Sequence, residues 1–159
     1  MFSKEMRSKL MSRVSGKNTK PEIVVRKILH ELGFRYRLHV SKLPGHPDIV
    51  LPKHKKIILV NGCFWHGHKD CRRSKRPHTN AIFWNKKIDD NIARDNKTID
   101  ELKLLGWDVL VIWQCQLNDI KKIKIVVLEF LGGDPEIGCG FNNELSECDL
   151  KDSFHVQTS

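Results

Sequence analysis

Residues 47–60 read Pro-Asp-Ile-Val-Leu-Pro-Lys-His-Lys-Lys-Ile-Ile-Leu-Val, and they hold the clearest strand signals of the chain. Residues 48–51 predict a short strand, and residues 52–55 predict the turn after it. The apolar run that follows, up to Val60, is uninterrupted, which is typical of a strand covered on both faces. The stretch therefore predicts two consecutive strands, of which the second is buried.

Two helices are predicted before these strands. A basic helix at about residues 3–15 comes first. The second helix begins with Thr19 as its N-cap and Glu22 as its capping-box residue, and it ends at Gly33. Its apolar stripe predicts a buried face made of Ile23, Val24, Ile28, Leu29 and Leu32.

The remaining elements complete the predicted fold. Alternation of apolar and polar residues predicts a half-exposed strand at 34–40, and the apolar run at 107–113 predicts another buried strand. Helical periodicity predicts a long helix at about 80–105 and a last helix at 117–131. This order predicts an α/β fold in which helices flank a mixed sheet.

Charge divides the 159 residues into two unequal parts. The whole chain carries 28 Lys and Arg against 19 Asp and Glu, but residues 132–159 hold one of these bases and six of these acids. Residues 1–131 therefore carry 27 minus 13, or +14. Such an excess favours a polyanionic partner, most commonly nucleic acid, although a solubilising surface would look similar. We expect one domain at 1–131 and an acidic tail at 132–159 that screens the domain or is disordered.

Membrane and disulfide classes are disfavoured. No apolar run approaches the roughly 20 residues that span a bilayer, and the first residues do not resemble a signal peptide. We therefore expect no membrane partner and a cytoplasmic location. Five cysteines without an export signal argue against a disulfide framework and leave metal ligation as the alternative.

A loop at 61–79 carries a pattern typical of zinc sites. Cys63, His66, His68 and Cys71 stand close together, and Cys115 follows the end of a predicted central strand. Thiolates and an imidazole can enclose a tetrahedral zinc ion and so staple the loop to the sheet. Spacing alone does not choose between the two histidines. Buried cysteines with surface histidines are the structural alternative.

Three residues suit hydrolysis of a phosphodiester. Asp48 at a strand start can hold Mg²⁺, which stabilises an attacking water and a leaving oxygen. His66 can act as the general base, because histidine exchanges a proton near neutral pH. Glu22 can reach metal-bound water. Each acid also has a purely structural interpretation, Asp48 as a turn residue and Glu22 as a helix cap.

Aromatic and basic residues next to this loop suggest contact with DNA. Phe64 and Trp65 lie within the loop, and Phe83 and Trp84 open the long helix, where planar rings beside cations suit insertion between bases. Core packing is the alternative, and we expect it for Phe83, Trp107 and Trp113.

Polar side chains offer further DNA contacts. Lys87 and Asn91 are four residues apart, so they share a helix face that can meet base edges. Arg72 and Arg73 follow Cys71 and favour a phosphate-facing loop, although a solvated turn would look similar.

Six short motifs in this order closely resemble the very-short-patch repair (Vsr) DNA mismatch endonucleases of bacteria, over residues 5–131. The motifs are Arg7-Ser-Lys-Leu-Met11-Ser, Asn18-Thr-Lys-Pro-Glu22, Leu43-Pro-Gly-His-Pro-Asp48-Ile-Val, Asn61-Gly-Cys-Phe-Trp-His66, Phe83-Trp-Asn-Lys-Lys-Ile and Gly106-Trp-Asp-Val-Leu-Val-Ile-Trp-Gln-Cys115. The resemblance implies a restriction-endonuclease-like fold. It also implies a Mg²⁺-dependent nick on the 5′ side of the thymine in a T:G mismatch left by deamination of 5-methylcytosine.

The resemblance also implies residue roles. Asp48 and the backbone carbonyl of Val60 would ligate magnesium, His66 would be the catalytic base, and Glu22 would hold metal-bound water. The implied zinc ligands are Cys63, His68, Cys71 and Cys115. The implied DNA contacts are Phe64, Trp65 and Trp84 from the major groove, Met11 from the minor groove, and Lys87 and Asn91 at the mismatched pair.

One departure from the family concerns catalysis. Asn61 stands where the family usually has a histidine that assists at the scissile phosphate, and an amide cannot carry a proton in its place. The second strand also lacks the acid and lysine of related nucleases, which is typical of the very-short-patch group.

Three functions thus stay open in order of preference: a mismatch-nicking enzyme, a restriction-type nuclease that cuts both strands, and a zinc-containing mismatch-binding module without catalysis. We expect a monomer that works on double-stranded DNA at the bacterial nucleoid, with other mismatch-repair proteins as possible partners.

Overall fold

The computed structural model describes residue 6 and residues 17–133. Apart from Met6, the predicted basic helix at 3–15, with Met11, lies outside the described residues, as does the acidic tail beyond residue 133.

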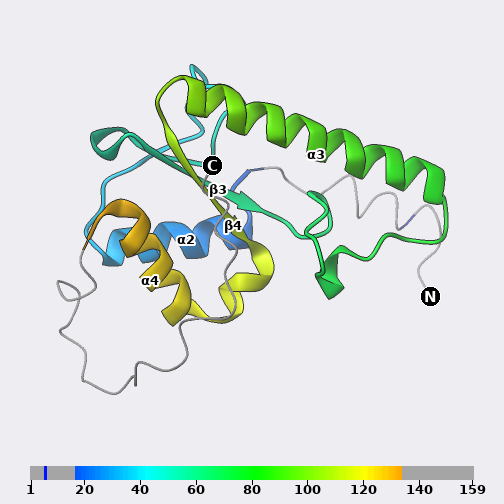
Figure 1. Ribbon diagram of the computed structural model, residues 1–159. Coiled ribbons are helices and arrows are strands. Elements are labelled where there is room, and N and C mark those ends of the chain that lie inside the picture. The colour runs from blue at the N-terminus through cyan, green and yellow to red at the C-terminus, as the bar shows by residue number, and fades with distance from the viewer. Residues whose placement is uncertain (1–5, 7–16, 134–159) are drawn as a thin grey trace.

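A four-stranded mixed sheet forms the centre of the described chain (Figure 1). Its order is β1-β2-β3-β4, with antiparallel pairing of β1 to β2 and of β2 to β3, and parallel pairing of β3 to β4. The parallel pair needs a crossover connection, and α3 provides it. The strands are β1 (Arg37–Leu38), β2 (Ile49–Leu51), β3 (Lys56–Asn61) and β4 (Asp108–Trp113).

Three helices cover the sheet. Figure 1 shows α3 on one side of the strands and α2 and α4 on the other. The predicted α/β fold, a mixed sheet flanked by helices, is therefore confirmed. The helices are α2 (Lys20–Glu31), α3 (Ala81–Leu104) and α4 (Ile120–Leu131).

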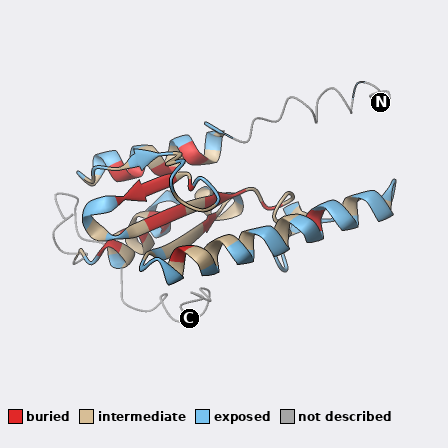
Figure 2. Ribbon diagram, turned by 90° about the horizontal axis from the view of Figure 1, so that it is seen from above, coloured by how far each residue is buried: buried red, intermediate tan, exposed pale blue. Residues whose placement is uncertain are grey.

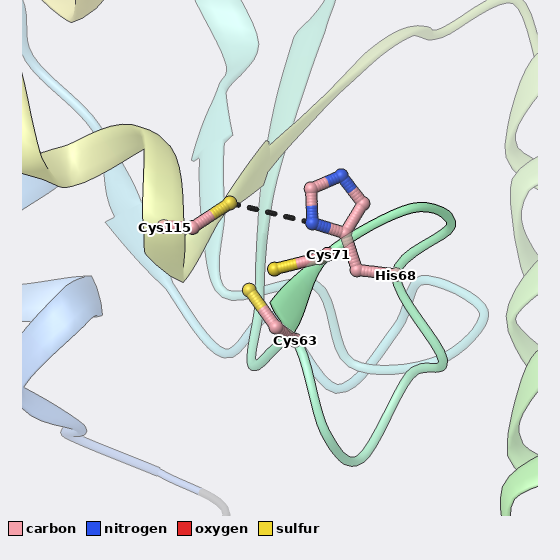
Figure 3. Close-up of side chains that lie close together, drawn as sticks. All are labelled: Cys63, His68, Cys71 and Cys115. Atoms are coloured by element: carbon pink, nitrogen blue, oxygen red, sulfur yellow. Dashed lines mark hydrogen bonds between the residues drawn. The ribbon is translucent and has the colours of Figure 1, made fainter. Parts of the chain in front are cut away.

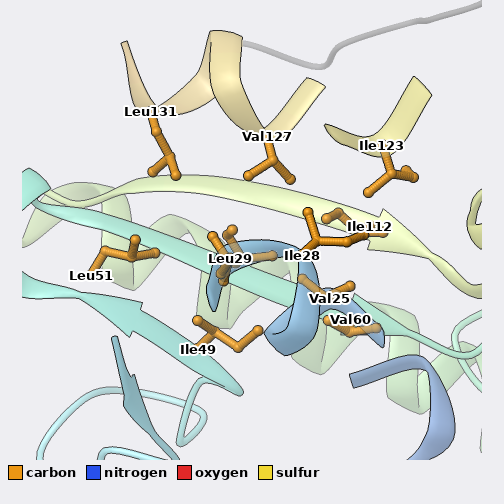
Figure 4. Packing of buried hydrophobic residues seen from close by; sticks show 11 residues of the cluster. Val25, Ile28, Leu29, Ile49, Leu51, Val60, Ile112, Ile123, Val127 and Leu131 are labelled. Atoms are coloured by element: carbon orange, nitrogen blue, oxygen red, sulfur yellow. The ribbon is translucent and has the colours of Figure 1, made fainter. Parts of the chain in front are cut away.

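The larger apolar core lies between the sheet and the pair α2 and α4 (Figure 4). Alternate residues of β2 point to opposite faces, as strand geometry requires: Ile49 and Leu51 belong to this core, whereas Val50 packs with Ile57 and Leu102 under α3. The members of the larger core are Val25, Ile28, Leu29, Ile49, Leu51, Ile58, Val60, Ile112, Ile123, Val127 and Leu131.

The predicted buried face of α2 is wrong in part. Val25 is fully buried, whereas Ile23 is 40% exposed. Ile28 and Leu29 are buried as expected. The helix is rotated relative to the prediction because Glu22, a polar residue that an apolar stripe omits, lies on the buried face with Val25 and Leu29.

Two predicted strands also need correction. The strand expected at 34–40 is two residues long: Arg37 and Leu38 pair with Val50 and Ile49 of the short strand β2. β4 lies at the edge of the sheet formed by the described residues, and Ile112 is its one fully buried residue. Cys115 thus follows an edge strand rather than a central one.

The last helix begins later than expected. Residues Gln114–Asn118 form a 3₁₀ helix, and Asp119 caps α4 by accepting a hydrogen bond from the backbone N–H of Lys122 at 3.1 Å. None of the helices in the described residues has both the length and the apolar character needed to cross a bilayer.

Candidate active site and metal centre

A cleft of about 840 Å³ opens between the sheet and α3. Its walls come from the start of α2, the segments around β2, the end of β3 with the loop that follows, and one side of α3. Eight residues predicted from the sequence line it: Glu22, Asp48, Val60, Asn61, Trp65, His66, Lys87 and Asn91.

Asp48 is fixed at the start of β2 by its neighbour strand. Its Oδ2 accepts a hydrogen bond from the backbone N–H of Val60 at 2.9 Å. Burial raises the pKa of Asp48, the Val60 hydrogen bond opposes that rise, and the nearby Glu22 carboxylate adds to it. Such a carboxylate, partly removed from water and close to a second acid, is suited to a divalent cation.

Glu22 is buried and fully engaged as a capping residue. Its carboxylate accepts hydrogen bonds from the backbone N–H groups of Asn18 and Thr19 at 3.0 and 3.3 Å, and from Thr19 Oγ1 at 2.9 Å. Arg26 Nη2 donates a fourth bond, at 2.8 Å. The capping role expected for this residue is therefore confirmed. Glu22 also lines the cleft, although it is only 2% exposed.

His39 lines the cleft beside these two acids and was not selected from the sequence. Ligand atoms of Glu22, His39 and Asp48 lie within 4.8 Å of one another. His39 has a left-handed backbone conformation (φ 45°), and its N–H donates to the carbonyl of Asp48 at 3.4 Å.

His66 is paired with Asp95 of α3, another residue that sequence reasoning missed. The ring Nδ1 donates a hydrogen bond to Asp95 Oδ2. A carboxylate can accept but not donate, so in the neutral ring Nε2 carries the free lone pair. Asp95 lies four residues after Asn91 on the same helix face, and this spacing was the one feature of the sequence that could have suggested it as a site residue.

Gly67 brings this loop against α3. Its φ is +60°, and a Cβ at this position would lie 2.6 Å from Ile92 Cδ1. Glycine is required here both for the backbone conformation and for the close approach.

Four metal-ligating side chains converge at a second site, next to the cleft (Figure 3). We call them the Cys/His cluster: Cys63, His68, Cys71 and Cys115, whose ligand atoms lie within 4.8 Å of one another. The structure thus selects His68 for this cluster, while His66 lies with Asp95. Three thiols and one imidazole are a donor set that fits zinc, and all three cysteines are free.

The environment of the cluster differs from one ligand to the next. Burial raises the pKa of Cys63 to about 12, and burial also raises that of Cys115. At Cys71 the backbone N–H of Arg73 lowers the pKa. The His68 ring stacks on Trp113 with centroids 4.2 Å apart, which fixes its orientation toward Cys115, whose Sγ lies 3.3 Å from Nδ1.

Three rings form an aromatic group beside the cleft: Phe64, Trp65 and Trp84. Their centroids lie 5.2 to 5.9 Å apart. Phe83 is 56% exposed, so the core packing expected for it is wrong. Trp107 packs against the core under α3, as expected. Trp113 stacks on His68 and is not among the residues of either apolar core.

The polar side chains predicted to contact DNA lie at two places, on α3 beside the cleft and on the turn after Cys71. Asn91 donates from Nδ2 to the carbonyl of Trp65 at 2.9 Å, whereas Lys87 is exposed with its Nζ 5.8 Å from the Phe83 ring. Arg72 and Arg73 are exposed on a 3₁₀ turn directly after Cys71, and Arg73 donates to Asn118 Oδ1 at 3.3 Å.

A cleft beside a mixed sheet that gathers two acids, a histidine–aspartate pair and the Trp65 ring is suited to metal-assisted hydrolysis of a phosphodiester, the reaction of an endonuclease. A family model described as DNA mismatch endonuclease Vsr matches residues 1–73. The type II nicking enzyme V.XorIIP of Xanthomonas oryzae pv. oryzae is 48% identical over 119 residues, which cover 75% of this chain and 87% of that protein. The chain belongs to the Vsr family of DNA mismatch endonucleases and related nicking enzymes.

Two further similarities accompany this result. DNA mismatch endonuclease Vsr of Escherichia coli K12 is 38% identical over 123 residues, which cover 77% of this chain and 78% of that one. The catalytic domain of the homing endonuclease I-Bth0305I matches with a TM-score of 0.49 and 29% identity, over 71% of this chain and 94% of that domain.

Proposed function

We propose that the protein nicks one strand of double-stranded DNA on the 5′ side of the thymine in a T:G mismatch that arises from deamination of 5-methylcytosine. The observation that carries this proposal is the shared cleft of Asp48 and the His66–Asp95 pair, with Trp65 of the aromatic group in its wall. Membership of the mismatch endonuclease family supports the choice of substrate. We expect the protein to act as a monomer on bacterial DNA, with other mismatch-repair proteins as candidate partners.

In this reaction Asp48 and the Val60 carbonyl would hold Mg²⁺, and the bound ion would supply neutralisation of charge on the phosphate and on the leaving oxygen. His66 takes the proton of the attacking water at Nε2, and Asp95 keeps the ring in the required orientation. Glu22 helps to orient water at the cleft wall. Asn61, 9% exposed in the same wall, can donate a hydrogen bond to the phosphate but no proton.

DNA recognition is assigned to the side chains around the cleft. Phe64, Trp65 and Trp84 insert beside the mismatch, which costs a few kcal/mol of unstacking per step. Lys87 and Asn91 meet the mismatched bases; to do so, the amide of Asn91 exchanges its bond to Trp65 for one to a base. Arg72 and Arg73 neutralise phosphates, and the adjacent Cys/His cluster binds structural zinc.

The test is a duplex with one T:G mismatch in a cytosine-methylation context, end-labelled on each strand in turn and incubated with Mg²⁺. A single nick beside the thymine, lost in Asp48→Ala while mismatch binding persists, is the expected result. A matched duplex is the control. Cutting of both its strands would instead indicate a restriction-type nuclease, and binding without any nick would indicate a non-catalytic module.

A further inference from the structure

Arg26 stands behind the cleft and contacts two of its wall residues. It lies one turn after Glu22 on α2, and its side chain is 13% exposed. Nη2 donates to Glu22 Oε2 at 2.8 Å and lies 3.2 Å from His39 Nε2, while Nη1 donates to Asn18 Oδ1 at 2.7 Å. One guanidinium therefore joins the start of α2 to the segment between β1 and β2.

The chemistry of these contacts fixes both partners. A guanidinium has donors and no acceptor, so His39 Nε2 must accept the bond, and the proton of the neutral ring then resides on Nδ1. His39 is in turn bonded through its backbone N–H to the carbonyl of Asp48. Arg26 thus constrains Glu22 directly and reaches the Asp48 segment through His39.

Charge gives a reason for a cation at this place. The carboxylates of Glu22 and Asp48 have ligand atoms within 4.8 Å of each other and repel when both are ionised. A guanidinium bonded to one of them offsets that repulsion. Its planar fork bonds Asn18 through Nη1 while Nη2 contacts Glu22 and His39, an arrangement that the single ammonium of a lysine reproduces less well.

Stability alone does not account for the arrangement. An exposed ion pair at this spacing on a helix contributes little to stability. Here the cation is largely buried, and its Nε is buried with no hydrogen-bond partner among the described residues, which is costly. A buried charge that is incompletely satisfied indicates that the position serves the adjacent cleft.

We propose that Arg26 is a positioning residue of the cleft, which holds Glu22 and His39 against Asp48 and so preorganises the site for its divalent cation. The proposal rests on the proposed metal-dependent cleavage and extends it to a residue outside the predicted metal ligands and DNA contacts. Loss of such an outer partner typically weakens metal binding by about 10–100-fold.

The test compares Arg26→Met and Arg26→Lys with Lys27→Met, a matched loss of charge at the next, exposed position of α2. Zinc-loaded, full-length proteins are titrated with Mn²⁺ in a calorimeter without DNA, and the Mg²⁺ dependence of single-turnover nicking is measured separately. We expect Arg26→Met to weaken Mn²⁺ binding about tenfold or more and to raise the Mg²⁺ concentration for half-maximal rate in parallel. Arg26→Lys should recover part of the loss, and Lys27→Met should match the wild type.

Several outcomes would overturn the proposal. A wild-type Mn²⁺ affinity in Arg26→Met, or equal losses in Arg26→Met and Lys27→Met, would leave Arg26 a structural residue. A partly unfolded variant lowers the number of binding sites in the titration but not the affinity of the remaining sites, so misfolding is distinguishable. If the wild type binds Mn²⁺ in an Arg26-dependent manner yet does not nick the T:G duplex, the proposed substrate fails and the role of Arg26 stands.

Discussion

In the proposed reaction, the pair of His66 and Asp95 carries out the proton transfer. The Asp95 carboxylate accepts the Nδ1–H bond, and this contact orients the ring. In Asp95→Asn the amide can turn its NH₂ toward the ring and favour the other tautomer. We predict that the single-turnover nicking rate falls by about 10²–10⁴-fold, the range typical of a disabled general base.

A matched control for this change lies on the same helix. Asp90 is exposed and pairs with Lys86 at 3.1 Å, so Asp90→Asn removes the same charge without touching the cleft. Its rate should equal that of the wild type, and both variants should bind the mismatched duplex as the wild type does. A normal rate in Asp95→Asn would remove the pair from the mechanism.

Residues with a strong local signal could be selected from the sequence, and residues defined by distant partners could not. Asp48 starts a strand, Glu22 completes a capping box, and the chain places both in the cleft. Asp95 and His39 meet partners that lie 29 and 13 residues away along the chain. No spacing rule connects such pairs before the fold is known.

At the scale of elements, the ends of a helix were easier to predict than its buried face. The capping box and Gly33 define the ends of α2 to within a residue or two, because they use local hydrogen bonds. Which side of α2 is buried depends on what packs against the helix. The buried side includes the Glu22 carboxylate and therefore leaves Ile23 exposed. The extent of β1 likewise depends on the length of β2.

The loop after β3 and helix α3 form one unit through Gly67. Gly67→Ala should destabilise the protein by about 1–2 kcal/mol from its left-handed backbone alone, with more from the clash with Ile92. We expect the added methyl group to shift the loop relative to α3, because it crowds Ile92 and Ile88, and this shift would disturb the contact between His66 and Asp95. We therefore predict a lower free energy of unfolding in urea together with slower nicking.

Gly106 provides the control for backbone strain. Its φ is +79°, but a Cβ there would meet no atom within 4 Å. Gly106→Ala should therefore carry the backbone cost and leave the nicking rate unchanged. Equal losses of stability in the two variants, with normal rates in both, would mean that the approach of Gly67 to α3 has no bearing on the cleft.

The described part of the molecule is built on a small sheet, and helix α3 extends beyond that sheet. Figure 2 shows that much of α3 is exposed, and Ile88 and Leu102 are its two fully buried residues. The long loop before α3 has little apolar core beneath it, so it depends on other contacts. The Cys/His cluster joins this loop, at Cys63, to the 3₁₀ turn after β4, at Cys115.

A metal bound in that cluster is therefore expected to stabilise the entire domain and not the loop alone. Cys115→Ser replaces a thiolate with a poor zinc ligand, so we predict that the variant loses its zinc. Its free energy of unfolding should fall by about 3 kcal/mol, which lowers Tm by about 6–12 °C in a chain of this size. Zinc content and thermal unfolding are measured on the same samples. Cys139→Ser, the same substitution at a cysteine that is not among the predicted zinc ligands, is the control and should keep both values. Because a buried thiol that binds no metal contributes mainly packing, a Cys115→Ser variant with an unchanged Tm would show that these four side chains do not hold the fold together through a metal.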